Sequence, residues 1–297
     1  MSANAVVEIA SVRPQPDAPD TSSHRQGSRE TAWFDVEHAP TGFRVSCSLT
    51  LSKAGGTTMR HRHVFSQLRY IMDGALYFSD RRFPAGTLIY TPESVNYGPQ
   101  SRREDVRLLV FQFPGPSDLM PLAARQLPPE KFAEGLAGLK AAGVRIEDGV
   151  AVFPDGRKDE PANAVYAFMA GRKLAYAPAR YLDPVTMQTG NFPWLPTAHA
   201  GVSARHLAYF NECGPSLAML KLDPGAALPA GRAACLEIRM VLKGAVECGG
   251  ERHAAVSRIY MPPGADYERL ESSEGAELLV FQIAVPGGEA PPPRVII

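Results

Sequence analysis

The sequence of 297 residues predicts an all-β protein made of two small barrels with a short helical connector. Three observations predict this fold class. Apolar residues alternate along short segments that end at Gly or Pro, as in half-buried strands. A set of residues recurs at a constant offset of 170 positions, which indicates two copies of one unit. One segment near residues 128 to 143 has the spacing of an amphipathic helix and lies between the copies.

The internal repeat is the strongest evidence for two barrels. It runs without a gap across two glycine turns, a proline and a five-residue strand, so we interpret it as a duplication of one fold. The strand Leu108-Leu-Val-Phe-Gln112 recurs as Leu278-Leu-Val-Phe-Gln282. The other matching residues are Gly55, Arg69, Gly74, Ala75, Ile89, Tyr90, Pro92 and Tyr97, which recur as Gly225, Arg239, Gly244, Ala245, Ile259, Tyr260, Pro262 and Tyr267.

The elements of the first copy follow one another along residues 31 to 115. Residues 1 to 30 are rich in Pro, Ser, Asp and Arg, so we expect a flexible N-terminal arm. Order is expected to begin near Trp33. Alternating apolar runs at 43–51, 67–77, 87–90 and 107–113 then predict the strands of the first barrel.

A connector at residues 116 to 199 separates the copies. Its helical segment runs from Leu127 to Gly143 and ends at glycine, a common helix stop. The rest of the connector is long enough to suggest a role at a site, and Arg180, Tyr181 and Asp183 are candidates to contact a bound acid or phenol. The alternative is that these residues form only a structural contact between the barrels. The second barrel is expected at 200–286, followed by a tail at 287–297.

Composition limits the classes of partner. Lys plus Arg equals Asp plus Glu at 31 each, so we expect no nucleic-acid partner. No apolar run approaches the roughly 20 residues that cross a bilayer, so we expect no membrane partner. The N-terminus does not resemble a secretory signal, and the chain is expected in the cytoplasm. Four cysteines without paired spacing suit free thiols: Cys47, Cys213, Cys235 and Cys248.

The segment from Gly55 to Gly74 predicts a metal site. His61 and His63 are two positions apart on a predicted strand, so both imidazoles project from one face and can reach one ion. Arg69 has the same parity, which makes it a candidate to anchor a substrate carboxylate. Two solvated histidines in a basic loop are the alternative.

This segment resembles the first motif of the cupin superfamily: Gly, five residues, His-x-His, then an acidic residue and a closing Gly. The resemblance implies a bicupin of two double-stranded β-helix, or jelly-roll, barrels. Gln67 stands at the acidic position, and Tyr97 stands where the second motif normally has histidine. Two of the four usual ligands are therefore changed. At the repeat offset the second barrel has Gly231, Ala233 and Glu237, so it is expected to be degenerate and metal-free.

The resemblance implies one divalent ion, Fe, Zn, Ni or Mn, held in the first barrel by His61, His63 and Gln67. Tyr97 is a candidate phenolate ligand or general acid, although Tyr267 at the equivalent position also favours a structural role. If Gln67 is not a ligand, the third ligand must come from Tyr97, solvent, or one of two more distant candidates, Gln100 and His199. In the second barrel, Glu237 and Arg239 share parity and could form an internal ion pair.

Three functions are compatible with these residues. The leading hypothesis is a metal-dependent, dioxygenase-like enzyme that acts on a small organic acid or phenol. A zinc enzyme that catalyses a rearrangement, isomerisation or hydrolysis is the second, because the run from His61 to Tyr70 also resembles zinc cupins that form nitrogen–nitrogen bonds. The third is a small-molecule-binding module without catalysis. The expected partner is a small molecule, and the assembly we consider is a homodimer.

Overall fold

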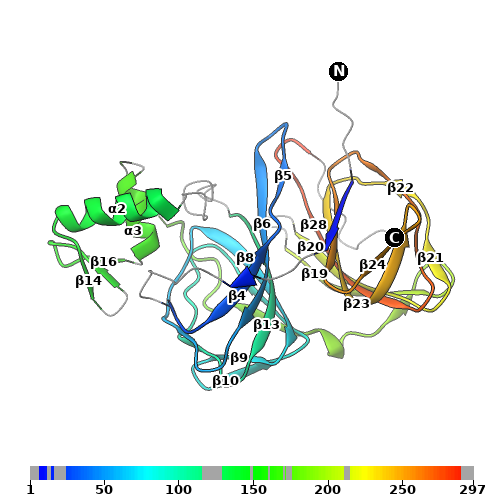
Figure 1. The fold of residues 1–297 in the computed structure, drawn as a ribbon, viewed down its shortest axis with the longest axis horizontal. Helices are drawn as coiled ribbons and strands as arrows, with labels where there is room; N and C mark the ends of the chain where they lie inside the picture. Colours follow the sequence, from blue (N-terminus) through cyan, green and yellow to red (C-terminus); the bar gives the residue numbers. More distant parts are fainter. Residues whose placement is uncertain are drawn as a thin grey trace. The chain divides into compact units, whose positions relative to one another are not determined.

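The structure is a computed structural model, and it describes residues 7–11, 15–16, 25–115, 129–147, 150–159, 161–169, 171, 176–210 and 215–288. The chain forms two compact units. The first-barrel unit comprises Pro14–Trp33 and Val45–Met187. The second-barrel unit comprises Met1–Arg13, Phe34–Arg44 and Gln188–Ile297. Figure 1 shows that both are built mainly from strands, so the predicted all-β fold is confirmed.

The first barrel is made of two sheets. The larger contains β2 (Gln15–Pro16), β4 (Arg29–Trp33), β6 (Phe43–Ser52), β8 (Phe65–Asp73), β11 (Thr87–Thr91), β13 (Val106–Pro114) and β17 (Val185–Gln188). Strand β5 (Val36–His38) pairs with β6, and its residues are counted with the second-barrel unit. The smaller contains β3 (Arg25–Gln26), β7 (Thr57–Thr58), β9 (Ala75–Phe78), β10 (Arg81–Pro84) and β12 (Gln100–Ser101). Their apolar side chains form a core that includes Ile71, Leu76, Phe83, Ile89 and Val106.

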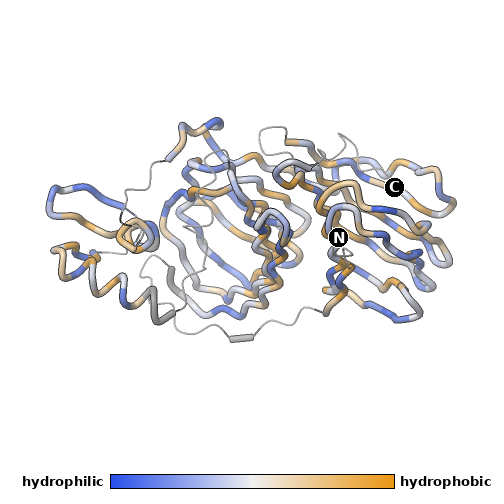
Figure 2. Tube along the Cα trace, turned by 90° about the horizontal axis from the view of Figure 1, so that it is seen from above, coloured by the Kyte–Doolittle hydropathy of each residue, from blue (hydrophilic) through white to orange (hydrophobic). Residues whose placement is uncertain are grey.

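The second barrel has one large sheet and a small two-stranded one. The large sheet contains β1 (Glu8–Ser11), β18 (Leu195–Pro196), β19 (Val202–Tyr209), β20 (Ser216–Leu222), β21 (Ala226–Leu228), β23 (Leu236–Cys248), β24 (Glu251–Ala254), β25 (Ser257–Met261), β27 (Leu270–Ser272) and β28 (Ala276–Ile283). The small sheet pairs β22 (Gly231–Arg232) with β26 (Asp266–Tyr267). Both barrels contain hydrophobic and hydrophilic stretches (Figure 2), and the central strands β8, β11, β25 and β28 are buried along almost their whole length.

The structure confirms the repeat. The order β11-β8-β13-β6 in the first barrel recurs as β25-β23-β28-β20 in the second. The pairing of Arg69 with Ile89 recurs between Arg239 and Ile259, 170 positions later. Gly74 and Gly244 occupy equivalent turns with φ of +70° and +67°. A Cβ on either glycine would overlap a carbonyl oxygen, that of residue 105 or of residue 275, so both turns require glycine.

The connector contains more structure than the single helix we predicted. The expected helix is present as α2 (Pro129–Ala141). It is followed by a three-stranded sheet of β14 (Arg145–Glu147), β15 (Val150–Val152) and β16 (Lys158–Asp159), and then by α3 (Pro161–Met169). We call residues 129–169 the helical insertion. A Cβ on Gly138 would overlap Phe168, so the glycines that weaken α2 as a helix allow α3 to pack closely against it.

The N-terminal arm also differs from the prediction. Glu8–Ser11 forms strand β1 and pairs with β25, because a terminal segment is ordered when a sheet edge offers it backbone partners. Arg258 donates a 3.1 Å bond to Glu8 across this pair. Cys47, Cys235 and Cys248 are free thiols, and Cys213 lies outside the described residues. No helix in the described part of the chain is long and apolar enough to cross a membrane.

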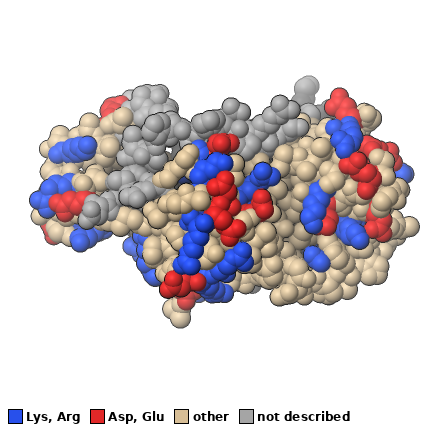
Figure 3. Space-filling model, turned by 60° about the horizontal axis from the view of Figure 1, so that its bottom comes forward, with Lys and Arg blue, Asp and Glu red and all other residues tan. Residues whose placement is uncertain are grey.

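Basic and acidic side chains are interspersed over the face of the molecule shown in Figure 3. The surface of the described chain has exposed ion pairs, such as Lys53 with Asp105 at 3.0 Å and Arg252 with Glu274 at 2.7 Å. This mixture agrees with the zero net charge of the sequence. The η1 turn (Thr189–Asn191) precedes β18 and completes the described helices and strands.

Candidate functional site

The candidate site lies inside the first barrel, beside an isolated antiparallel β-bridge between His61 and Tyr97. The backbone amide of His61 donates to Tyr97 O at 3.1 Å, and the amide of Tyr97 donates to His61 O at 3.0 Å. The neighbouring strand β8 carries Gln67 and Arg69 on the same face. Residues that are 36 positions apart in the sequence are therefore held side by side by backbone bonds.

His61 has the tautomer of a metal-ligating histidine. Its Nδ1 lies 2.7 Å from Met59 O, and a carbonyl oxygen can only accept, so Nδ1 carries the proton. The lone pair is then on Nε2. Histidines that bind metals commonly donate their other ring N–H to a backbone carbonyl in this way.

His63 lies next to His61. The centroids of the two rings are 4.8 Å apart, with the planes nearly perpendicular, and the His63 ring stacks on Phe65 at 4.3 Å. His63 Nε2 is 2.8 Å from Tyr97 Oη. The nitrogen that would face an ion is thus already engaged with the phenol.

Tyr97 is the centre of a buried hydrogen-bond network. Arg69 donates to Tyr97 Oη at 2.7 Å and to Gln100 Oε1 at 3.0 Å, and its guanidinium carbon is 4.7 Å from the centroid of the Tyr97 ring. Tyr97 Oη is also 3.4 Å from Gln67 Oε1. The phenol has one proton to donate. The shorter distance to His63 favours that partner over Gln67.

The structure therefore brings together all five side chains that we proposed for the site. All are buried: the exposed fraction is 2% for Gln67 and Tyr97, 6% for His61, and 7% for His63 and Arg69. Their roles remain predictions. Gln100, which we considered only as a distant candidate ligand, binds Arg69 instead. No sequence signal separates these two roles, because both place the amide inside the barrel.

The other candidates lie elsewhere. His199 belongs to the second-barrel unit, where its amide donates to Thr197 Oγ1 at 3.1 Å. Arg180 and Asp183 are exposed. The Tyr181 ring centroid is 6.4 Å from that of Tyr90 in a perpendicular arrangement, which agrees with a packing role.

The equivalent place in the second barrel is occupied by an ion pair. Glu237 accepts a 2.5 Å bond from Arg239 Nε and a 2.6 Å bond from Gln282 Nε2. Burial alone would lower the pKa of Arg239, but Glu237 and Tyr267 outweigh it and raise the pKa above its ordinary value. A Cβ on Gly231 would lie only 2.5 Å from Tyr267 Oη, so a histidine does not fit there.

The donor set of the first barrel fits a divalent ion in part. Two neutral imidazoles are close together, and the oxygens of Gln67 and Tyr97 face the same region. Within the described ranges, no group of three His, Cys, Asp or Glu side chains could hold an ion. A third ligand would therefore be an amide or phenol oxygen, water or substrate. The nearby charge of Arg69 opposes a second cation unless an anion binds as well.

Comparison with known proteins agrees with the fold. Residues 182–286 match the ChrR cupin-like domain. No curated protein matches the chain.

Several solved structures resemble nearly the whole chain. A putative dioxygenase from Nostoc punctiforme is 11% identical with a TM-score of 0.62, covering 94% of this chain and 83% of its own. A protein from Geobacillus kaustophilus is 10% identical with a TM-score of 0.56, covering 98% and 100%. A mutant of Bacillus subtilis oxalate decarboxylase is 14% identical with a TM-score of 0.56, covering 96% and 78%. The chain therefore has the fold of these cupin structures, and its second barrel matches a cupin-like family model, as the sequence resemblance predicts.

Proposed function

We propose that the first barrel of this cupin chain is the active site of an enzyme that acts on a small organic acid with the help of one divalent metal ion. His61 and His63 would hold the ion, with an oxygen of Gln67 or Tyr97 as a further ligand. The observation that carries the proposal is the 2.7 Å contact of His61 Nδ1 with Met59 O, because it assigns the proton of the neutral ring to Nδ1 and the lone pair to Nε2.

An organic acid suits the charge of this interior. Glu237 and Arg239 of the second barrel sum to zero, whereas Gln67 and Arg69 at the same repeat positions sum to +1. A carboxylate would restore the balance that Glu237 provides in the other copy. Arginine is well suited to bind it, because its planar fork can donate two parallel hydrogen bonds.

The side chains have distinct roles in this proposal. A bound divalent ion would supply a Lewis acid that polarises an oxygen of the substrate. Arg69 orients the carboxylate, and Tyr97 Oη gives or takes a proton beside His63 Nε2. The burial of the whole set excludes water from these groups, which strengthens their electrostatic interactions.

The reaction class rests on weaker support. One similar structure is described as a putative dioxygenase and another as an oxalate decarboxylase, and a study of the latter names Mn(II) centres. Oxidation with O₂ is therefore our leading class, with the non-redox zinc reaction as the alternative. Metal identity separates them, since zinc does not support oxygen chemistry.

A metal-free binding module is a second candidate, and one observation favours it. His63 Nε2, Tyr97 Oη and Arg69 already form a closed network at 2.7 and 2.8 Å. A metal on His63 would have to displace the phenol from that nitrogen.

Elemental analysis of protein purified without added metal tests the proposal. We expect about one divalent ion per chain, lost in His61→Ala and in His63→Ala, since two histidines are the minimum on which further ligands can build. His253→Ala on β24 is the matched control and should keep the metal. Two ions per chain, or metal retained in the double variant of His61 and His63, would contradict the proposed centre. No binding of any divalent ion would leave the binding module as the function.

A further inference from the structure

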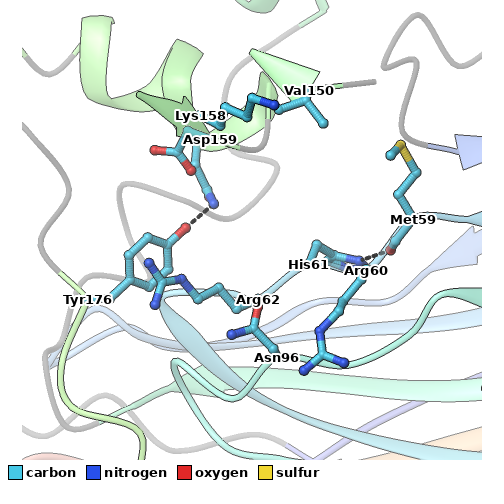
Figure 4. Close-up of a pocket in the computed structure, with 10 residues that line it drawn as sticks. Met59, Arg60, His61, Arg62, Asn96, Val150, Lys158, Asp159 and Tyr176 are labelled. Atoms are coloured by element: carbon cyan, nitrogen blue, oxygen red, sulfur yellow. Dashed lines mark hydrogen bonds between the residues drawn. The ribbon is translucent and has the colours of Figure 1, made fainter. Parts of the chain in front are cut away.

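A cavity of about 220 Å³ lies between the first barrel and the helical insertion. Of the five buried side chains of the candidate site, only His61 lines it, so the cavity is a separate feature. The barrel contributes residues 59–62 and Asn96, and the insertion contributes Val150, Lys158 and Asp159 (Figure 4). Both walls belong to the first-barrel unit. The volume is below the roughly 300–1,000 Å³ of sites for drug-sized ligands, so it suits a small metabolite.

Cationic side chains dominate the lining of this cavity. Arg60, Arg62 and Lys158 are exposed, and within the described ranges none of the three forms an ion pair. The one carboxylate of the lining, Asp159, pairs at 3.6 Å with Arg157, which is outside the lining. A single exposed cation is ordinary. Three cations and a single carboxylate among the described lining residues leave an excess of positive charge, which attracts anions.

The side chain of Arg62 is held in place by Tyr176 and Asn163. Its guanidinium carbon lies 3.8 Å from the centroid of the Tyr176 ring, and Asn163 donates a hydrogen bond to the Tyr176 hydroxyl. Asn163 is itself buried, with 3% exposed. Stacking on an aromatic ring holds the plane of a guanidinium while its N–H groups point outward along the edge. Arg62 is therefore better ordered for binding an anion than a freely rotating surface arginine.

The positive groups come from two walls. Arg60 and Arg62 extend from the barrel with their guanidinium groups pointing apart, that of Arg62 toward Tyr176, and Lys158 extends from β16 of the insertion (Figure 4). His61 also lines the cavity, and its ring centroid is 4.4 Å from that of Tyr97. A ligand in the cavity would thus have one anionic group for each wall and would lie against His61, the member of the buried network that lines the cavity.

We propose that this cavity binds a small dianion, with one carboxylate or phosphate group held by Arg62 on the barrel wall and a second negative charge held by Lys158 on the insertion wall, while Arg60 adds to the positive potential. The proposal does not depend on the metal, because none of these three residues is a proposed ligand. It makes the helical insertion part of a binding site rather than a spacer between barrels.

Isothermal titration calorimetry on the full chain stripped of metal tests this proposal. The probes are isophthalate as a dicarboxylate, inorganic phosphate, and isophthalamide as the uncharged analogue. We expect at least one dianion to bind, no heat from the diamide, and weaker binding as salt rises. Comparison of isophthalate with phosphate tells whether carboxylate or phosphate is the preferred group.

Variants locate the binding. Lys158→Gln and Arg62→Gln should each weaken binding about tenfold or more, the usual effect of losing one charge-assisted hydrogen bond. Lys140→Gln, an exposed cation at the end of α2, is the control and should bind as the wild type does. Lys158 is exposed, so its variant should fold even if that of Arg62 does not.

The proposal fails if neither dianion binds at millimolar concentration, if isophthalamide binds equally well, or if Lys158→Gln leaves the affinity unchanged. These outcomes are separate from those of the metal experiment. Loss of metal in His61→Ala with intact anion binding would support both proposals, whereas anion binding without any metal centre would support only this one.

Discussion

The buried ion pair between Glu237 and Arg239 should contribute strongly to the stability of the second barrel. Glu237→Gln removes the charge that neutralises Arg239 and converts this position to the residue that the first barrel has, Gln67. In the first barrel Gln100 accepts a hydrogen bond from Arg69 at 3.0 Å. The equivalent position in the second barrel is a leucine, residue 270, which cannot accept one. The variant should therefore leave a buried cation poorly solvated.

The cost can be estimated from the burial of the pair. The side chains of Glu237 and Arg239 are 6% and 5% exposed, so solvent screening does not reduce the interaction much. Breaking one side of such a pair typically costs about 3–5 kcal/mol of unfolding free energy. For a unit of this size that corresponds to a fall in melting temperature of roughly 6–20 °C.

Differential scanning calorimetry is the appropriate assay, because two units can unfold in separate transitions. Only the transition of the second-barrel unit should move. The double variant Glu237→Gln, Arg239→Met is the control and should recover much of the loss, since it removes the uncompensated charge. A shift of less than about 2 °C in the single variant, or no recovery in the double variant, would refute the reasoning.

Three further predictions address other parts of the chain. Gly244→Ala should destabilise the second barrel in urea unfolding, because φ is +67° and a Cβ would overlap Gly275 O; Gly287→Ala, at φ +75° with no atom within 4 Å, should cost less. Burial raises the pKa of Tyr260 from 10.0 to about 12, so the folded state holds this proton more tightly than the unfolded chain. This contribution to stability is complete below pH 10 and is lost as the pH rises to about 12, and Tyr260→Phe should remove that part of the slope of stability against pH. Gln67→Glu should bind a divalent ion more tightly in metal titrations and lower activity, whereas an unchanged affinity would mean that Gln67 does not contact the ion.

Much of the architecture could be predicted because matching residues recur at a constant offset of 170 positions, which indicates two copies of one barrel. Gly74 and Gly244 mark the same turn, and the alternation of β8 fixes the parity of Gln67 and Arg69. The helical insertion has no copy at the offset, and α3 has only nine residues, too few for a clear periodicity. The pairing of β1 with β25 joins segments about 250 positions apart, and neither segment carries a signal for the other.

The site was predictable only in part, for a different reason. The spacing of His61 and His63 predicts that both side chains point to the same face of the strand. It does not predict the hydrogen-bond partner of each ring nitrogen. The bond of His61 Nδ1 to Met59 O and that of His63 Nε2 to Tyr97 depend on ring rotations set by the folded barrel. The cationic cavity was missed because Arg62 and Lys158 are almost 100 positions apart and meet only when the insertion packs on the barrel.

Each barrel buries an arginine, and the partners of the two arginines differ. This difference is one reason to propose the first barrel as the functional one. In the second barrel Glu237 neutralises Arg239, and Tyr267 lies too close to Gly231 for any side chain there. Among the described residues this interior pairs one carboxylate with one arginine, so the two charges sum to zero. The first barrel has Gln67 in place of that carboxylate, and its arginine donates instead to the neutral oxygens of Tyr97 and Gln100. The two interiors exclude one another for a physical reason, since a glutamate beside the arginine cancels the charge that would attract an anion and Tyr267 fills the space that a side chain at residue 231 would need.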